Sequence, residues 1–250
     1  MRFCERHEKI IEILNERGSA SVQFLADTLF FSLPTIRRDL SYLEKQNRLR
    51  RTFGGAVIHK DNVSEIPFDL RNGVDSKIKD ELAQKASELI KDDMVIFLDA
   101  SSTVLRLVPY LKNFKNITVI TNSPKVSLEL AEQNVTSIST GGVLLKNSKA
   151  YVGNFAEEFI RRFNADICFL SCRGISEDGM LSDGSIEEAS LRLAMIQHSK
   201  KSVFIMSSNK LRKQYSFNMI HASKVEIICD KAVDFTSSAC RCDGITHEGE

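Results

Sequence analysis

The chain has 250 residues, 42% of them hydrophobic, and a formal net charge of +1. This length and apolar fraction are enough for two ordinary domains, each with its own core. No run approaches the roughly 20 apolar residues of a membrane span, and the charges between Met1 and Arg17 argue against a secretory signal. We therefore expect a cytoplasmic protein that does not contact a membrane.

The six cysteines follow no regular framework of spacings, so free thiols are expected in a reducing compartment. Cys240 and Cys242 lie near His247, but a C-x-C pair without a second pair is not typical of a zinc site. We expect no metal site and no cofactor.

Three helices are predicted in the first 46 residues. The first spans residues 5–17, with an apolar stripe on one face. The second spans residues 22–29 after Ser21, a good N-cap, and the third runs from about residue 33 to 46 after Ser32, another N-cap candidate.

Positive charge concentrates at this end of the chain. Residues 1–58 hold ten Lys or Arg against seven Asp or Glu, a net charge of +3, whereas residues 59–250 hold 24 against 26, a net charge of −2. Residues 49–57 predict a short hairpin that turns at Gly54 and Gly55. Two helices, a basic helix and a basic hairpin are typical of a winged helix-turn-helix, a DNA-binding module.

A recognition helix needs side chains that reach base edges, with cations nearby for the phosphates. The outward face of the third helix and the basic hairpin meet this description, although solvated surface charge alone would explain an isolated Arg pair. The predicted DNA contacts are Ser32, Thr35, Arg37, Arg38, Tyr42, Arg48, Arg50, Arg51, Gly54 and Gly55.

Residues 59–75 are polar and aperiodic, and they predict a linker between a domain at 1–58 and a second at 76–234. An amphipathic helix is expected from Ser76 and would pack on the second domain or support dimerisation. Beyond residue 93, apolar runs alternate with helices, at residues 94–98, 117–120, 135–138, 167–170, 203–206 and 225–229. The alternation predicts an α/β domain with a mainly parallel sheet. Residues 235–250 are expected to be a disordered tail.

Small polar residues follow most of these runs, where parallel sheets bind their ligands. Hydroxyls, backbone N–H groups at helix starts and a cation suit a phosphate, and Asp99 and Asn122 suit sugar hydroxyls. Each junction alone reads as an N-cap. Five junctions on one sheet edge favour a phosphorylated polyol as ligand.

Several strings closely resemble the DeoR family of bacterial regulators: T-I-R-R-D-L at 35–40, G-G-A at 54–56, D-A-S-S-T at 99–103 and T-N-S at 121–123. The similarity covers roughly residues 4 to 232. It implies a DNA-binding winged helix-turn-helix in which Asp39 orients neighbouring Arg residues. It also implies an effector domain related to ribose-5-phosphate isomerase that senses sugar phosphates.

The resemblance assigns the effector pocket to residues at the strand ends. Carried over by position, they are Asp99, Ser101, Ser102, Thr103, Thr121, Asn122, Gly141, Gly142, Arg173 and Lys210. The expected function is that of a repressor of a sugar or carbohydrate operon, released from double-stranded operator DNA by a phosphorylated sugar or related metabolite. Because operators commonly have two half-sites, at least a homodimer is expected.

The alternative function is a sugar-phosphate isomerase or deaminase. Its general acid and base would come from Asp178, Glu187 or Glu188 and Lys210, but no tight catalytic motif is present. An enzyme would also not need the basic helix and hairpin, so we expect no catalytic residues.

The sequence departs from the family pattern at five positions. Phe30 stands at a turn where the family commonly has Gly, and Phe53 replaces the usual His before Gly-Gly. In the second domain, Ser207 replaces a common Asp, Arg212 falls near a usual Gly, and Arg192 appears where Lys is common. These departures affect the inter-helix turn, the wing tip and the choice of ligand.

Overall fold

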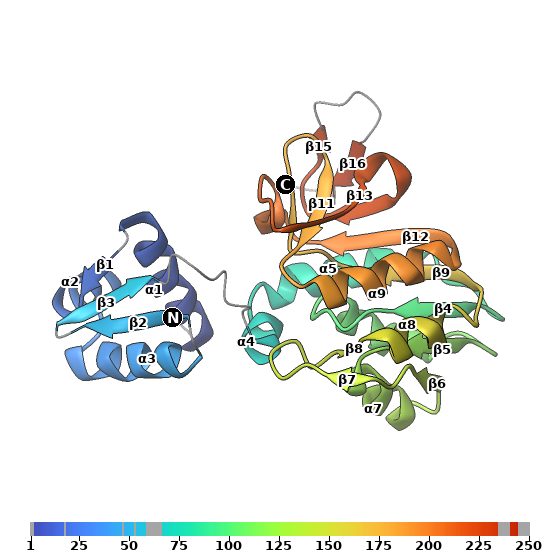
Figure 1. Cartoon of the computed structure of the whole chain (residues 1–250), viewed down its shortest axis with the longest axis horizontal. Coiled ribbons are helices and arrows are strands. Elements are labelled where there is room, and N and C mark those ends of the chain that lie inside the picture. The colour runs from blue at the N-terminus through green and yellow to red at the C-terminus, as the bar shows by residue number, and fades with distance from the viewer. Residues whose placement is uncertain are drawn as a thin grey trace. The chain divides into compact units, whose positions relative to one another are not determined.

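The computed structural model describes residues 3–17, 19–46, 48–52, 54–58, 67–234 and 241–244. They belong to two compact units, residues 1–74 and 75–250 (Figure 1), each of which is described by itself. No helix in the described part of the chain is long and apolar enough to cross a membrane.

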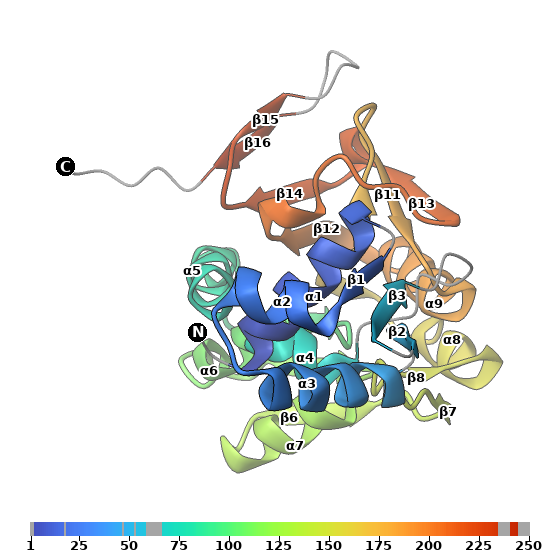
Figure 2. The same cartoon turned by 90° about the vertical axis from the view of Figure 1, so that its left-hand side faces the viewer.

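Up to residue 58, the first unit contains three helices and a three-stranded antiparallel sheet of order β1-β3-β2 in its described residues. Its elements are α1 (Phe3–Arg17), β1 (Ser19–Ser21), α2 (Val22–Leu29), α3 (Leu33–Lys45), β2 (Leu49–Thr52) and β3 (Gly55–Ile58). Ser21 and Ser32 cap α2 and α3, because their side chains accept hydrogen bonds from the backbone amides of Phe24 and Thr35. The predicted helices and hairpin are thus confirmed (Figure 2).

Apolar residues of α1, α2, α3, β2 and β3 make one core, and the half-buried Ala20 of β1 packs against it. Ile10, Leu25, Ile36 and Leu40 are fully or almost fully buried between the helices. Short strands such as β1 are too brief to show an alternating pattern, and this one was not predicted.

The segment expected as a linker contains a helix, α4 (Phe68–Gly73). Pro67 precedes it, in the position where a missing backbone N–H costs nothing. The segment is therefore partly helical instead of wholly irregular, and residues 59–66 lie outside the described residues.

The second unit is built on an eight-stranded sheet of order β15-β16-β14-β12-β9-β4-β5-β6, in which all neighbours are parallel except β15 and β16. The strands are β4 (Val95–Leu98), β5 (Thr118–Thr121), β6 (Thr136–Ser139), β9 (Ala165–Leu170), β12 (Ser199–Met206), β14 (Glu226–Cys229), β15 (Val233–Asp234) and β16 (Arg241–Gly244). The predicted parallel α/β sheet is confirmed. The predicted disordered tail is wrong for residues 241–244, which pair with β14, while 235–240 and 245–250 lie outside the described residues.

Helices and short turns connect these strands. They are α5 (Ser76–Ser87), η1 (Val104–Leu107), α6 (Val108–Leu111), α7 (Pro124–Glu132), α8 (Asn154–Ile160), α9 (Ile186–Gln197), η2 (Ser208–Lys210) and η3 (Ala222–Lys224). α5 packs on β12 and β14, and α9 packs on β9 and β12. The helix predicted from Ser76 is therefore part of the second unit's packing.

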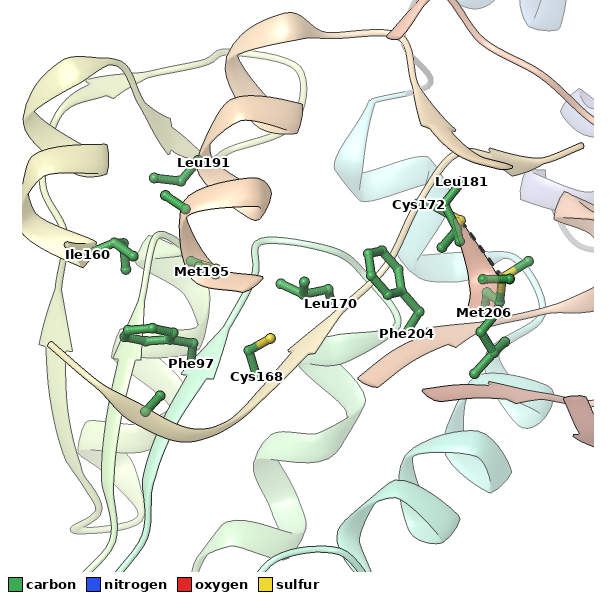
Figure 3. Packing of buried hydrophobic residues seen from close by; sticks show 14 of the residues in the cluster. Phe97, Ile160, Cys168, Leu170, Cys172, Leu181, Leu191, Met195, Phe204 and Met206 are labelled. Carbon is green, nitrogen blue, oxygen red and sulfur yellow. Dashed lines mark hydrogen bonds between the residues drawn. The ribbon is translucent and has the colours of Figure 1, made fainter. Parts of the chain in front are cut away.

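A continuous core lies between α8, α9 and the sheet (Figure 3). Phe97, Leu170 and Phe204 from three adjacent strands are buried together with Leu191 and Met195 of α9. This packing fixes the strands whose carboxyl ends carry the predicted pocket residues.

Two small sheets complete the unit. β10 (Gly174–Ile175), β11 (Met180–Asp183) and β13 (Phe217–His221) form an antiparallel sheet, and β7 (Val143–Leu144) pairs with β8 (Tyr151–Val152). They were not predicted, since two to five residues carry little periodic signal.

Candidate functional site

The outer face of α3 presents two arginines. Arg37 and Arg38 are exposed, while Ile36, Leu40 and Leu43 of the same helix are buried. The helical repeat of 3.6 residues separates the two sets. This face therefore offers guanidinium groups that can bond base edges.

The start of α3 is held by its cap. Ser32 Oγ lies 2.8 Å from Thr35 Oγ1 and accepts a hydrogen bond from the Thr35 amide. Both residues were predicted to contact DNA, and here they order the first turn of the helix.

Asp39 joins α3 to α1. It is almost fully buried and accepts hydrogen bonds from Arg6 Nε and Nη2, while His7 Nε2 lies 3.0 Å from its Oδ1. The hydrogen bond to Asp39 raises the pKa of Arg6, whereas burial lowers the pKa of His7. Tyr42, a predicted DNA contact, is half-buried and stacks on the His7 ring, with centroids 5.0 Å apart. Asp39 of α3 thus forms a buried ion pair with an arginine of α1.

Arg48 was predicted to contact DNA, and the structure corrects this. It is 4% exposed, and its Nη1 donates to Glu8 Oε1 at 2.8 Å. The pair ties the start of β2 to α1. A buried, paired guanidinium is a structural group, because exposing it would break the pair.

The β2–β3 hairpin, which is the wing of the winged helix-turn-helix, is attached to the end of α3. The Arg51 amide donates to Glu44 Oε1 at 2.8 Å and Arg51 Nη1 donates to Ser41 Oγ at 2.6 Å, yet the Arg51 side chain is exposed. Phe53 and the side chain of Arg50 lie outside the described residues.

The two wing glycines have different roles. Gly54 is exposed, and a Cβ there would touch nothing. At Gly55 a Cβ would lie 2.1 Å from the carbonyl oxygen of Ala20. Gly55 is therefore required for the close approach of β3 to β1, not as a surface contact.

Phe30 occupies the turn between α2 and α3 with φ of +58° and a side chain 91% exposed. Its amide donates to the carbonyl of Ala26 and ends α2. The turn between α2 and α3 is thus made without glycine, by a phenylalanine in the left-handed conformation. Arg212, near another usual glycine, also has a positive φ of +57°.

In the second unit, β4 lies between β5, which follows it in the chain, and β9, which comes much later. The connections after β4 and after β9 run toward opposite edges of the sheet. Such a reversal of strand order is a topological switch point, where parallel sheets commonly form their binding crevice. The residues that follow β4 and β9 are Asp99 and Ser171. Asp99, one of the predicted pocket residues, therefore lies at this switch point.

Asp99 is a buried anchor of this edge. Its Oδ1 accepts from the Ser101 amide at 2.9 Å, and its Oδ2 accepts from the Ser171 amide at 3.1 Å and from Arg192 Nε at 2.8 Å. Asp99 thereby joins the ends of β4 and β9 to α9. With these partners it holds the loops in place, and its predicted role in bonding sugar hydroxyls is not the one the geometry supports.

Arg192 lies at the centre of a buried ion network. Besides Asp99 it bonds Asp183 Oδ2 at 2.7 Å and Glu188 Oε1 at 3.3 Å, and Arg173 Nε lies 3.7 Å from Asp183 Oδ1. Burial would raise the pKa of Asp183, but Arg192 and Arg173 outweigh it and lower that pKa. Arg173 was predicted to bind effector, whereas Arg192 was noted only as a departure. The i, i+4 spacing of Glu188 and Arg192 on an apolar helix was the available signal.

Two lysines bring positive charge to the same edge. Lys210 Nζ donates to Ser171 Oγ at 2.7 Å, and Lys79 Nζ donates to Ser102 Oγ at 3.3 Å. Lys79 is only 5% exposed and was not predicted. Its spacing to the buried residues Leu82 and Ala83 of α5 places it on the inward face, a signal that the sequence contained.

Most hydroxyl groups at this edge act locally. Ser101 Oγ accepts from the Val104 amide, and Thr121 Oγ1 accepts from the Ser123 amide. Ser102 accepts from Lys79, and Thr103 is buried next to η1. The N-cap interpretation therefore applies to Ser101, and a turn-stabilising one to Thr121.

Asn122 pins the β7–β8 hairpin to the sheet. Its Nδ2 donates to the Tyr151 carbonyl at 3.0 Å, and its own carbonyl accepts from the Tyr151 amide at 2.8 Å. The Asn122 Oδ1 atom is buried and has no hydrogen-bond partner among the described residues. Such an acceptor is available to a hydroxyl group of a ligand.

Gly141 and Gly142 shape the turn after β6, with φ of +63° and +112°. A Cβ on Gly142 would lie 2.6 Å from the Val152 carbonyl oxygen. Both positions have backbone angles that glycine adopts without strain, so these residues shape the turn.

The cysteines that the structure describes in full are structural. Cys168, Cys172 and Cys229 are buried free thiols, as expected, and burial raises the pKa of Cys172 to about 11. No cluster of three or more His, Cys, Asp or Glu suited to a metal occurs in the described part of the chain. The side chains of Cys240, Cys242 and His247 lie outside it.

Two family models match the chain. One, described as the DeoR-like helix-turn-helix domain, matches residues 6–62, and the other, described as the DeoR C terminal sensor domain, matches residues 75–231.

Individual relatives match over most of their length. An uncharacterized HTH-type transcriptional regulator, YulB of Bacillus subtilis, is 37% identical over 84% of this chain and 81% of its own. The L-fucose operon activator of Haemophilus influenzae is 34% identical over 89% and 90%, respectively. The glycerol-3-phosphate regulon repressor of Escherichia coli is 28% identical over 91% and 90%.

Among solved structures, a D-ribose-5-phosphate isomerase in complex with phospho-erythronic acid is 16% identical over 54% of each chain, with a TM-score of 0.42. No conclusion about activity rests on so distant a likeness.

Proposed function

Because this chain belongs to the DeoR family of transcriptional regulators, we propose that it binds operator DNA through its first unit and regulates a carbohydrate operon. Its second unit senses a phosphorylated sugar or related metabolite. The observation that carries this proposal is the exposed Arg37–Arg38 pair on a helix that Asp39 bonds to α1. The same chain has a topological switch point at which Lys79 and Lys210 bond the residues that follow β4 and β9.

DNA recognition depends on the two faces of α3. Arg37 and Arg38 project from the outer face and are suited to bidentate hydrogen bonds with guanine O6 and N7. Asp39 on the inner face fixes the helix to Arg6. Arg51, exposed on the wing and bonded to the end of α3, is placed for a phosphate. Direct base contact is thereby combined with a rigid support.

Effector recognition depends on charge at the strand ends. Lys210 donates to the hydroxyl group of Ser171 and Lys79 to that of Ser102, and an anionic phosphate is a stronger acceptor than a hydroxyl. The buried Oδ1 atom of Asn122 is available to a sugar or polyol hydroxyl. A relative of this chain is named for glycerol 3-phosphate, which combines both groups. We therefore propose a phosphorylated polyol or sugar as the effector.

The regulator acts in the cytoplasm as a homodimer or higher oligomer, and effector binding releases the operator. Symmetric dimers match operators with two half-sites. Repression is the mode named for the Escherichia coli relative, and activation is the mode named for the Haemophilus relative. Of the two we propose repression.

Catalysis is not part of this proposal. Glu188 bonds Arg192, Glu187 is exposed beside the Ser185 hydroxyl, and Asp178 is exposed in the turn before β11, bonded to Ser176. A general acid or base has to lie beside the reacting carbon. These carboxylates have structural partners instead.

The test uses the full-length protein and DNA from upstream of its own gene. A panel of sugar and polyol phosphates is first screened for an increase in melting temperature, because a ligand selective for the native state stabilises it. The stabilising compound is then added to fluorescence anisotropy titrations with this DNA and with unrelated DNA. Selective binding that the compound weakens is expected. Equal affinity for both DNAs, or turnover of ribose 5-phosphate or glucosamine 6-phosphate, would overturn the proposal.

A further inference from the structure

The turn that carries Lys210 is joined directly to the first residue of the second unit. From the middle of η2, Asn209 Nδ2 donates a hydrogen bond of 2.7 Å to Asp75 Oδ2. Asp75 precedes α5, and the second unit begins with it. A proposed effector contact thus lies one residue and one hydrogen bond away from the boundary between the units.

η2 is built so that Lys210 and Asn209 move together. The amides of Lys210 and Leu211 donate to the carbonyls of Ser207 and Ser208, each at 3.1 Å. The first residue of the turn is fixed to the sheet, because Asp230 accepts from both the amide and the hydroxyl of Ser208. Asn209 lies between this fixed start and Lys210, and its Oδ1 accepts from Ser207 Oγ at 2.8 Å, so a displacement of Lys210 would strain the contacts of Asn209.

Asp75 has an unusual conformation for its position. Its φ and ψ are +52° and +35°, and its side chain makes no cap hydrogen bond to α5. An aspartate before a helix normally has extended dihedral angles and accepts from the amide two or three residues ahead. The structure shows Asp75 left-handed and bonded to Asn209, and an extended Asp75 that caps α5 would exclude this bond. A change between these two conformations redirects the chain that precedes α5.

The same turn of α5 also contacts the end of β4. The Lys79 amide donates to the Asp75 carbonyl at 3.0 Å, and the Lys79 ammonium donates to Ser102 Oγ. The start of α5 is thus connected to the carboxyl-end edge of the sheet at two points, through Asn209 and through Ser102.

We propose that the Asn209–Asp75 hydrogen bond couples effector binding to operator binding. This inference rests on the proposed function, since the ligand of Lys210 is taken to be the effector. When an anion draws Lys210 away from Ser171, η2 turns and Asn209 releases Asp75. Asp75 then caps α5, and the redirected segment before it disfavours the operator-bound arrangement. Asp75 and Asn209 are positioning residues and do not touch the ligand.

A matched pair elsewhere in the unit provides the control. Asp93 is also left-handed, with φ of +65°, and Asn116 Nδ2 donates to its Oδ1 at 3.0 Å. Both control residues are exposed. Asp93 lies in the loop between α5 and β4, and Asn116 lies in the loop before β5. Asn209→Ala and Asn116→Ala each remove an exposed amide–carboxylate bond, and Asn209→Ala also removes the 2.8 Å hydrogen bond that Ser207 Oγ donates to Asn209 Oδ1. Ser207→Ala removes that second bond alone and completes the control.

The experiment measures all three variants in the full-length protein without ligand. In Asn209→Ala, amide hydrogen exchange at Lys77 and Ile78 is expected to slow, because these amides gain the cap. Affinity for DNA upstream of the gene is expected to fall at least about fivefold, the lower end of allosteric coupling. Asn116→Ala and Ser207→Ala are expected to change neither. If amide exchange at Lys77 and Ile78 is the same in Asn209→Ala as in Asn116→Ala, the proposed role of the Asn209–Asp75 hydrogen bond is wrong.

A ligand arm separates this inference from the proposed function. Wild-type protein is compared in inorganic phosphate and in chloride of equal ionic strength, with Lys210→Ala beside it. Phosphate that slows exchange at Lys77 and Ile78 only when Lys210 is present supports the full relay. If phosphate slows amide exchange at Lys210 but leaves exchange at Lys77 and Ile78 of α5 unchanged, the proposed coupling from Lys210 to α5 is wrong. No phosphate effect at either place counts against the proposed effector site, while the Asn209→Ala result still decides the coupler.

Discussion

Replacing Asp39 with alanine removes the clamp between α1 and α3. Asp39 is 1% exposed and holds Arg6 by two hydrogen bonds. Removing one partner of a buried ion pair costs about 3–5 kcal/mol. At roughly 0.05–0.15 kcal/mol per residue, a unit of this size has an unfolding free energy of only about 4–11 kcal/mol. Asp39→Ala is therefore expected to remove a large part of the first unit's stability.

Differential scanning calorimetry of the full chain measures this loss, because the two units can unfold in separate transitions. At about 4–8 °C per kcal/mol, the transition of the first unit should fall by more than about 12 °C while the other stays in place. Asp27→Ala is the control, because Asp27 is exposed and bonds only Gln23 of its own helix in the described contacts. A shift no larger than that of Asp27→Ala would refute the clamp.

Four further changes separate base contact, phosphate contact and structural support. Arg38→Ala is expected to lower operator affinity by about 1–3 kcal/mol with little effect on unrelated DNA, and equal losses in anisotropy titrations would exclude base readout. Arg51→Ala should weaken all DNA alike and reduce the salt slope by about one, which titrations at several salt concentrations check. Arg48→Ala should lower the melting temperature of the first unit, because Glu8 loses its partner, while the ratio of operator to unrelated affinity stays constant. Burial lowers the pKa of His7 below its ordinary 6.5, so protons favour the unfolded chain and the first unit should lose stability as pH falls below 6.5, a loss that His7→Gln removes in pH-dependent melts.

Features fixed by neighbouring residues could be predicted from the sequence. Ser21 and Ser32 act as N-caps because the cap bond spans three residues, and the helices behind them begin as expected. The order of the parallel strands was not predicted. The existence of six of them was, since apolar runs are visible locally, whereas β16 lies where a disordered tail was expected.

Features fixed by distant residues could not be predicted. Arg48 belongs to the same basic cluster as Arg51, yet Glu8, forty residues earlier in the chain, draws it into a buried pair. The role of Arg192 likewise depends on Asp99, which lies 93 residues away. A basic run in a sequence does not distinguish a paired guanidinium from one that faces solvent.

The central claim is that one chain binds DNA and a phosphorylated metabolite with reciprocal coupling. Operator affinity is measured with and without the stabilising effector, and effector affinity with and without operator, by anisotropy and calorimetric titration. Both ratios are expected to exceed about fivefold and to agree with each other, because linkage requires one coupling free energy. An effector that binds the second unit while leaving operator affinity unchanged would contradict it.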